Sequence, residues 1–332
     1  MEKYTAKYND WEYELLYENG DIPKLNVKPN KSQEKPKSLS KYYSLNENNV
    51  LAFLNNEFYV SQPDQLNDLF DSSLSLISFK DRPFSHFIKF LKDINADIKQ
   101  EEDRYNDNPK KYLQIMKHYF YRSWLQITGI LCMTDDTVNE LMWAHYTNNE
   151  GFLIEFDYTR FGDMFMGPYP INYNPPLTPV DFGKMDNNLG FFISSLIKKD
   201  IWSYEKEYRF LCISEDEKGY KVSGTFDNST FHQNLQTRFI SYPKESIKKI
   251  ILGFAFFKNE IDRQKANYSE RKYDVIFAGG NATIKILLFN YLIKHKIPVE
   301  LMVFDKLTFE LKTIPISISK ISESKYSIKE LH

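Results

Sequence analysis

The chain has 332 residues, of which 42% are hydrophobic, and its 43 basic and 45 acidic side chains leave a formal net charge of −2. This length allows one large domain or two small ones. The balance of charge does not predict whole-surface attraction to nucleic acid or to an anionic membrane, although a local basic groove stays open. No apolar run reaches about 18 residues and no basic start precedes an apolar stretch. We therefore expect no membrane span, no secretion signal and a cytoplasmic location.

Residues 1–38 are expected to form a loosely ordered arm and linker, ahead of a single α+β domain that spans residues 39–332. Residues 11–17 are a candidate short helix, after which three prolines interrupt a stretch rich in lysine, asparagine and serine. Such a stretch has few apolar side chains with which to make contacts. The arm is expected to pack on the body or on a partner.

Helices and strands then follow one another without a regular βαβ rhythm. Helical spacing of apolar side chains predicts helices at 46–54, 84–94, 113–127, 138–147, 189–199 and 282–295. Apolar and aromatic runs predict strands at 40–44, 57–61, 129–133, 152–157, 202–213 and 249–253, and a closing hairpin at 299–304 and 307–316. Between these elements we expect a solvated connector at 93–111 and a long loop at 160–185. The mixture predicts an α+β fold with a mixed, mainly antiparallel sheet and flanking helices.

The predicted strand at 202–213 opens with charged side chains and ends in apolar ones. Because side chains alternate between the two faces of a strand, Glu205, Glu207 and Arg209 are expected on one face, about 7 Å apart in a row. Charge at the start of a strand that runs into the core is costly unless it is paired or used in chemistry. The structural alternative is a surface ladder of ion pairs of small energetic value.

Common metal-binding and catalytic motifs are missing from the sequence. Its six histidines are scattered, none at ligand spacing from a cysteine or another histidine, so we expect no metal site. Cys132 and Cys212 lie in apolar, strand-like runs and are expected to be reduced core thiols. There is no phosphate loop and no nucleophile elbow, and Gly279-Gly280-Asn281 before a helix is expected to be a turn with an ordinary N-cap.

Three further segments combine polar and aromatic side chains. They are Lys41-Tyr42-Tyr43-Ser44, Asn67-Asp68 with Asp71, and Trp143-Ala144-His145-Tyr146. Each has a structural alternative, because the tyrosines can pack in the core, Asn67-Asp68 can form an Asx turn, and His145 can be a satisfied buried histidine. Together with the charged face of 202–213, these segments are the candidates for a shared cleft.

In this order, the segments resemble a bacterial family catalogued as domain of unknown function number twenty-nine seventy-one. Its pattern has a K-Y-like opening, N-D-P-F-[DE], W-x-H-Y before a strand that starts with glycine, W-x-x-E-x-E-[WY]-R and a later I-I-L-G strand. The matching residues are Lys41-Tyr42-Tyr43, Asn67-Asp68-Leu69-Phe70-Asp71, Trp143-Ala144-His145-Tyr146 with Gly151, Trp202 to Arg209, and Ile250-Ile251-Leu252-Gly253, within about residues 39–255. Leu69 departs from the pattern, since the family usually has proline there.

The resemblance implies a role in phage defence and abortive infection, as an anti-phage or toxin-type effector. The family's layout also looks like that of ADP-ribosyltransferases, in which an aromatic first strand holds the nicotinamide ribose and a late strand opens with Glu or E-x-E. On this ground we expect an ADP-ribosyltransferase-like fold with NAD as the substrate. The chain lacks a recognisable Arg or His of the first motif, which leaves the subclass open.

The same resemblance implies roles for individual residues. Glu207 would stabilise the oxocarbenium-like state that forms as nicotinamide leaves and would hold the ribose 2′-hydroxyl, while Glu205 would activate the acceptor as general base. Tyr42 or Tyr43 would stack on nicotinamide. The rest of the expected NAD-binding set is Lys41, Asn67, Asp68, His145, Tyr146 and Arg209. The acceptor would be a protein or a nucleic acid, with a defence-system protein as a further partner.

Two other functions compete with this one. A non-catalytic sensor or scaffold of a defence system would use the many aromatic residues and the N-terminal arm to recognise a phage protein or nucleic acid. A metal-dependent nuclease would need Glu155-Phe156-Asp157 or Glu205-Lys206-Glu207 as its acidic pair, and the second has Glu where that motif has Lys. One concave pocket lined by Glu205, Glu207, Tyr43 and His145 would favour the enzyme. If Glu205 and Glu207 instead faced bulk solvent with no cleft, the sensor would be favoured.

Overall fold

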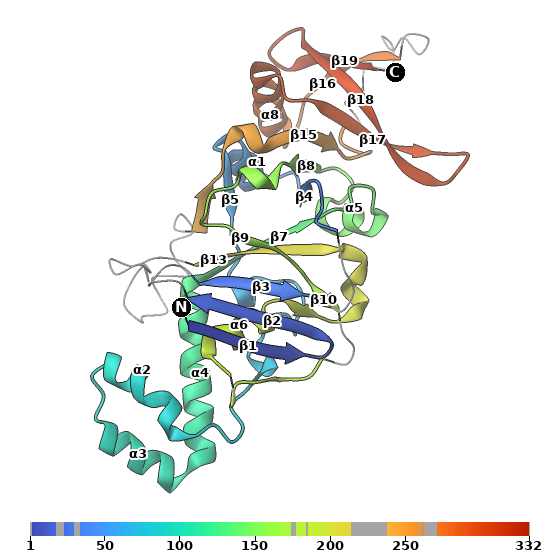
Figure 1. Cartoon of the computed structure of the whole chain (residues 1–332). Coiled ribbons are helices and arrows are strands. Elements are labelled where there is room, and N and C mark those ends of the chain that lie inside the picture. Colours follow the sequence, from blue (N-terminus) through green and yellow to red (C-terminus); the bar gives the residue numbers. More distant parts are fainter. Residues whose placement is uncertain are drawn as a thin grey trace.

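A ten-stranded sheet runs from the end of the molecule that holds the C-terminal strands to its middle (Figure 1). The computed structural model describes residues 2–17, 23–29, 34–173, 177–183, 185–213, 238–258, 260–261 and 271–331. In spatial order the strands are β16 (Lys272–Ile276), β19 (Lys325–Glu330), β18 (Glu310–Lys320), β17 (Val299–Asp305), β15 (Ile247–Leu252), β8 (Phe152–Phe156), β4 (Leu39–Tyr43), β7 (Thr128–Thr134), β13 (Glu207–Ile213) and β9 (Met166–Pro170). Among these described strands, β15 and β17 pair in parallel and the other neighbours are antiparallel. The predicted α+β class with a mixed, mainly antiparallel sheet is confirmed.

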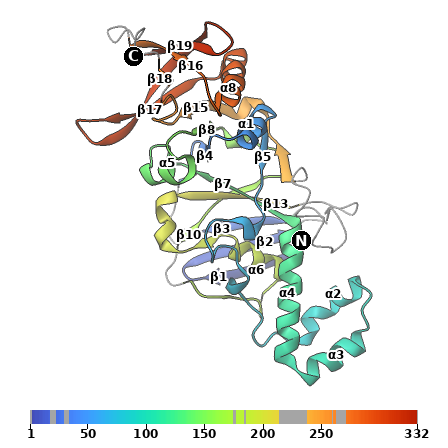
Figure 2. The ribbon, with the colours of Figure 1, turned by 180° about the vertical axis from the view of Figure 1, so that it is seen from behind.

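Helices lie at both ends of this sheet and along its sides. The described α-helices are α1 (Glu47–Leu54), α2 (Ile88–Asp93), α3 (Ile98–Asp107), α4 (Pro109–Ile127), α5 (Glu140–Thr147), α6 (Asn187–Ser194) and α8 (Ala282–His295). Both views place α2, α3 and α4 at one end of the molecule and α8 with β16–β19 at the other (Figures 1 and 2). None of the helices in the described ranges combines the length and the apolar character that crossing a membrane requires.

The N-terminal segment forms a three-stranded antiparallel sheet rather than a loose arm. Its strands are β1 (Glu2–Tyr8), β2 (Trp11–Tyr17) and β3 (Lys24–Lys28). The helix expected at 11–17 is wrong, because Trp11, Tyr13 and Leu15 are buried while Glu12 between them is exposed, which is the two-residue period of a strand. Tyr13 and Leu15 belong to the same apolar core as α6 side chains such as Leu189, so the segment packs on the body.

Three strands and one further helix lie in stretches that we expected to be irregular. The expected connector at 93–111 contains α3, which starts at an Asp97 cap and buries none of its residues. The expected loop at 160–185 contains β9, β10 (Asn172–Tyr173) and β11 (Val180–Asp181). There β10 pairs with β12 (Ile197–Lys198), and β11 with β6 (Ile77–Ser78). Two-residue strands carry too little periodic pattern to be read from sequence.

β13 is buried on both faces and separates two apolar cores. Phe210 and Cys212 belong to the core that includes α1 and α8, whereas Leu211 and Ile213 belong to the core that includes α4 and α6. The alternation predicted for this part of the strand is therefore correct from Glu207 onward. Cys212 is a free, buried thiol, as expected.

The sheet is loosely joined between β4 and β7, which is where the candidate site lies. β4 pairs with β8 through all five of its residues but with β7 at a single position, Ser40 opposite Thr134. Beyond that position Ser61, which follows β5 (Glu57–Tyr59), bridges to Ile130 of β7. Side chains of β4, of β7 and of the loop after Ser61 therefore face a common space.

Candidate active site

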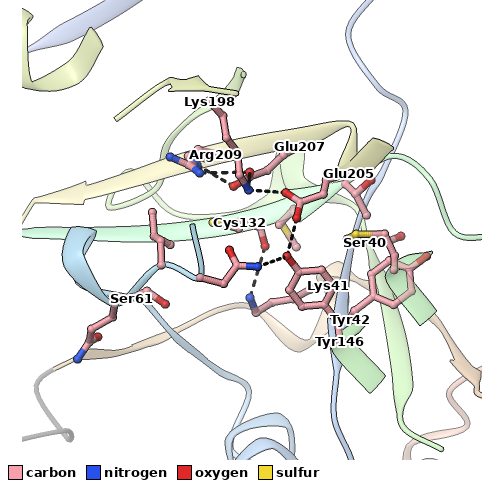
Figure 3. A pocket seen from close by; sticks show the side chains of 16 residues that line it. Ser40, Lys41, Tyr42, Ser61, Cys132, Tyr146, Lys198, Glu205, Glu207 and Arg209 are labelled. Carbon is pink, nitrogen blue, oxygen red and sulfur yellow. Dashed lines mark hydrogen bonds and ion pairs between the residues drawn. The ribbon is translucent and has the colours of Figure 1, made fainter. Parts of the chain in front are cut away.

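A pocket of about 230 Å³ lies where β4 and β7 separate (Figure 3). Its lining comes from these two strands, from β12 and β13, from α5, from the loop after Ser61, and from η5 (Asp200–Glu205), a 3₁₀ helix. Seven of the ten predicted site residues line this pocket: Lys41, Tyr42, Asn67, Tyr146, Glu205, Glu207 and Arg209. Four of the five sequence segments that carry the family resemblance thus contribute side chains to one concave site, and Ile250-Ile251-Leu252-Gly253 does not.

Glu205 and Glu207 reach the pocket from two different elements. η5 ends at Glu205, Lys206 has a left-handed backbone with φ of 44°, and β13 begins at Glu207. The strand predicted to begin at residue 202 is therefore wrong for its first five residues. The left-handed residue turns the chain between the two carboxylates, so that both meet the same lysine. A left-handed backbone is uncommon for a residue other than glycine, and uncommon among these for lysine.

The lysine that joins the carboxylates is Lys198 of β12. Its Nζ lies 2.5 Å from Oε2 of Glu205 and 3.2 Å from Oε2 of Glu207. Lys198 is 2% exposed, Glu205 3% and Glu207 5%. Ionised groups this deeply buried are costly unless they are paired, and these three neutralise one another in part.

Arg209 fixes the opposite side of Glu207. Its Nε donates to Oε1 of Glu207 at 2.7 Å, Nη2 donates to Oε2 of Glu207 and to Asp71, and Nη1 donates to Asp71 and to the backbone carbonyl of Ser195. These bonds engage all five N–H donors of the guanidinium. Arg209 is therefore saturated and holds Asp71 and Glu207 in place, which is a correction to its expected place in the NAD-binding set.

The two glutamates have pKa shifts in opposite directions. Burial opposes ionisation of Glu207, but the charges of Arg209 and Lys198 overcome it and hold the pKa of Glu207 well below its usual range. For Glu205, burial and the nearby charge of Glu207 raise the pKa, and Lys198 offsets only part of this. Carboxylates that are pushed apart in this way are suited to different chemical roles.

A chain of hydrogen bonds connects Glu205 to the mouth of the pocket. The amide of Asn67 donates to the hydroxyl of Tyr146 at 2.7 Å, and this hydroxyl donates to Oε1 of Glu205 at 2.6 Å. Figure 3 shows Tyr146 reaching from α5 toward Glu205. Asn67 is exposed and Tyr146 is half-buried, so the chain leads from the surface to a buried carboxylate.

Lys41 lies across the pocket from the acidic residues (Figure 3). Its Nζ contacts the backbone carbonyl of Cys132 at 3.4 Å, and burial lowers the pKa of the lysine. The thiol of Cys132 contacts Glu207, and burial raises the pKa of this thiol, so it is a poor nucleophile. Cys132 is a free thiol, as expected, although it is half-buried at the pocket rather than enclosed in the core.

Three of the predicted residues lie outside the pocket. Tyr43 is buried in the core and stacks on Phe152, with 5.3 Å between ring centroids, because it points to the face of β4 that packs against α1. Asp68 accepts a hydrogen bond from the backbone N–H of Phe70 at 3.1 Å, which is the Asx turn foreseen as its structural alternative. His145 is exposed, with Nδ1 3.3 Å from the hydroxyl of Tyr204, and is neither a pocket residue nor a buried histidine.

Lys198 is the important residue that was not foreseen. It lies on a two-residue strand, next to an exposed-looking Lys199-Asp200 pair, and nothing in the local sequence distinguishes it. The sequence signal that could have indicated it is the balance of buried charge, because two glutamates that enter a core need more than one cation. Asp71 belongs to a recognised segment, but its partner Arg209 lies 138 positions away in the chain.

No protein-family model, no curated protein and no solved structure matches this chain. Within the described ranges, no group of three or more histidine, cysteine, aspartate or glutamate side chains is arranged to hold a metal ion. The carboxylates of Asp71, Glu205 and Glu207 are instead engaged by Lys198 and Arg209. The geometry described above is therefore the basis for a functional proposal.

Proposed function

We propose that the pocket is the active site of an enzyme that cleaves NAD between nicotinamide and ribose and transfers the ADP-ribosyl group to a macromolecule or to water. The observation that carries this proposal is the pair of buried carboxylates, Glu205 and Glu207, which line one pocket with pKa values shifted in opposite directions. The resemblance of the surrounding segments to a phage-defence family supports a role as an anti-phage or toxin-type effector.

Cleavage breaks the bond between ribose C1′ and the pyridine nitrogen, and nicotinamide leaves with the electron pair as a neutral molecule. Positive charge then develops on the ribose. Three carboxylates and two cations form the buried cluster, so one negative charge is unmatched when all are ionised. A fixed negative charge in a buried site stabilises such a cation strongly. Glu207, which stays ionised, is the residue proposed for this role.

Glu205 is proposed to receive the proton of the acceptor. Its raised pKa brings it closer to neutral pH than an ordinary glutamate, and general bases work best when their pKa is near the working pH. The attacking hydroxyl, amine or water gives its electron pair to C1′ and its proton to this carboxylate. In this scheme Glu205 takes up the proton of the acceptor and Glu207 stabilises the positive charge on the ribose.

The size of the pocket suits one end of the substrate. Its volume of about 230 Å³ is below the roughly 300–1,000 Å³ of pockets that enclose a drug-sized ligand, so it would hold the nicotinamide-ribose end and leave the rest at the mouth. Lys41, whose ammonium meets a carbonyl rather than a carboxylate, is the cation proposed to contact the phosphates. Tyr42, which lines the pocket with its hydroxyl held by the Asp136 carbonyl, is the aromatic wall.

A non-catalytic sensor remains the second candidate on one observation. At the tip of the β17–β18 hairpin, Leu307 is 91% exposed and Phe309 73% exposed. Large apolar side chains exposed together are typical of a surface that binds another protein. Both views show this hairpin extending from the end of the molecule (Figures 1 and 2).

The test uses the full-length protein and NAD labelled separately in nicotinamide and in the adenylate half. It is incubated alone and with extract of phage-infected cells, so that an inactive resting state is covered. We expect release of nicotinamide and loss of about 100-fold or more of this activity in Glu207→Gln. The exposed Glu102 of α3 supplies the control variant Glu102→Gln, which should match the wild type.

The outcomes separate the three functions. If nicotinamide is not released and label is not transferred under either condition, the enzymatic function is contradicted and the sensor is favoured. Toxicity that EDTA abolishes, without consumption of NAD, would favour the metal-dependent nuclease.

A further inference from the structure

Glu205 is the proposed proton acceptor, yet each of its carboxylate oxygens already accepts a hydrogen bond from another side chain. Oε2 is held by Lys198 at 2.5 Å and Oε1 by the hydroxyl of Tyr146 at 2.6 Å. The residue is 3% exposed. Each oxygen keeps a second lone pair, but so little of the residue is exposed that an attacking hydroxyl group or water molecule has little direct access to it.

Tyr146 is placed between Glu205 and the pocket. It lines the pocket, is half-buried rather than buried, and its hydroxyl already donates to Glu205. The amide of Asn67 donates to the same oxygen from the exposed side at 2.7 Å, which fixes the direction of the phenol hydrogen toward Glu205. A phenol oxygen in this arrangement has lone-pair capacity left for one more donor.

We propose that Tyr146 is a catalytic residue that relays the acceptor's proton to Glu205. As the acceptor oxygen or nitrogen forms its bond to C1′, its proton moves to Oη of Tyr146 and the phenolic proton moves to Oε1 of Glu205. Tyrosine ends the step neutral, Glu205 ends it protonated, and the electron pair of the broken C1′–N bond has left on nicotinamide. This inference rests on the proposed function and adds the group that touches the acceptor.

The surroundings of Tyr146 favour a concerted relay over a free phenolate. Burial, followed by the charge of Glu205, raises the pKa of Tyr146, so the hydroxyl does not ionise by itself near neutral pH. Both proton transfers then occur together along two hydrogen bonds that are already formed. Asn67 acts as a positioning residue, since it orients the phenol and exchanges no proton.

The relay is tested with Tyr146→Phe, which keeps the ring and removes only the hydroxyl. Transfer of ADP-ribose to water or to a hydroxyl acceptor should fall by about 100-fold or more, the usual contribution of a general acid–base group, with KM for NAD changed by less than about threefold. Tyr204→Phe is the matched control, because Tyr204 lies one residue before Glu205 and contacts His145 outside the pocket. It should keep wild-type rates.

A nucleophile that carries no proton distinguishes the relay from a purely structural role of Tyr146. Azide needs no proton removal, so it should restore product formation by Tyr146→Phe to within about tenfold of the wild type if the lost function is the relay. Independently of turnover, carbon-13 NMR of the Glu205 carboxyl should show a higher pKa in Tyr146→Phe, because the lost hydrogen bond stabilises the ionised form.

Each result decides the proposal. Full activity of Tyr146→Phe in an active wild-type background would overturn the relay and leave the proposed function standing, and so would an inactive variant that azide does not rescue. If the wild type released no nicotinamide, the proposed function would be contradicted, and the relay would be contradicted with it.

Discussion

The ammonium of Lys198 lies 2.5 Å from Oε2 of Glu205, and both side chains are almost fully buried. The two residues are seven positions apart, on β12 and at the end of η5. This contact brings the last residue of a 3₁₀ helix next to the first residue of β13, because the same ammonium also meets Glu207. Lys198 therefore sets the separation of the two carboxylates on which the proposed chemistry depends.

Removal of Lys198 should destabilise the fold. In Lys198→Met the carboxylates of Glu205 and Glu207 lose a shared buried cation, and breaking a buried pair typically costs about 3–5 kcal/mol. Chemical denaturation measures the free energy of unfolding. The control is Lys7→Met, which removes an exposed ion pair with Glu12 and should leave that free energy nearly unchanged. Equal effects of the two variants would show that the buried cluster does not contribute to stability.

The stability of the fold should depend on pH in opposite ways through the two glutamates. The folded-state pKa of Glu207 is below its unfolded value of about 4.3, so its contribution is present above that pH and is lost as pH falls. The folded-state pKa of Glu205 is raised, so ionising it costs stability as pH rises above about 4.3.

Glutamine variants measured by urea denaturation between about pH 3 and 7 separate these contributions. Relative to the wild type, Glu207→Gln should be most destabilising at pH 7 and least at pH 3. For Glu205→Gln the order should reverse, with the smallest destabilisation at pH 7. Parallel pH profiles for the two variants would contradict the opposite pKa shifts.

Tyr43 should be a core residue with no part in binding NAD. Tyr43→Phe should leave nicotinamide release unchanged, since the ring packs on Phe152 away from the pocket. Tyr43→Ala should cost about 3–5 kcal/mol of stability through the cavity it leaves. Tyr42→Ala is the matched comparison on the pocket side of the strand, and should weaken NAD binding measured by calorimetry. Weaker NAD binding by Tyr43→Phe would place this ring in the site after all.

The backbone conformation at Lys206 predicts that glycine is tolerated better at this position than residues with a side chain. Its φ of 44° lies in the left-handed region, where a side chain costs about 1–2 kcal/mol and glycine costs little. Lys206→Gly should therefore be neutral or stabilising, although it removes an exposed ion pair with Asp136. Lys206→Val should be less stable than Lys206→Gly by at least about 1 kcal/mol in thermal or urea denaturation. The reverse order would indicate that the turn between the two glutamates has a different backbone.

Much of the secondary structure was predictable because it depends on local patterns. The helix at 46–54 and the strand at 152–157 correspond to α1 and β8, and the closing hairpin to β17 and β18. Errors occurred where tertiary packing decides the conformation. The 11–17 segment is a strand because its alternate side chains enter a core that lies far away in sequence.

The two carboxylates of the candidate site could be predicted from the sequence, whereas the residues around them could be predicted only in part. Glu205 and Glu207 stand out in any sequence reading, since two acids lead directly into an apolar strand. Their common partner Lys198 does not, because no local pattern marks a lysine that will be buried. The face to which each tyrosine of β4 points also depends on how that strand is placed between β8 and β7.

The sequence by itself determined the class of fold and four of the segments that line the pocket, because periodicity and residue type are local properties of the chain. Only the tertiary structure decided which of their side chains meet. Burial of Arg209 between Asp71 and Glu207 assigns it to the framework, and a left-handed Lys206 turns Glu205 toward Lys198. Pairing of buried charges depends on contacts between residues as far as 138 positions apart, which no local pattern encodes.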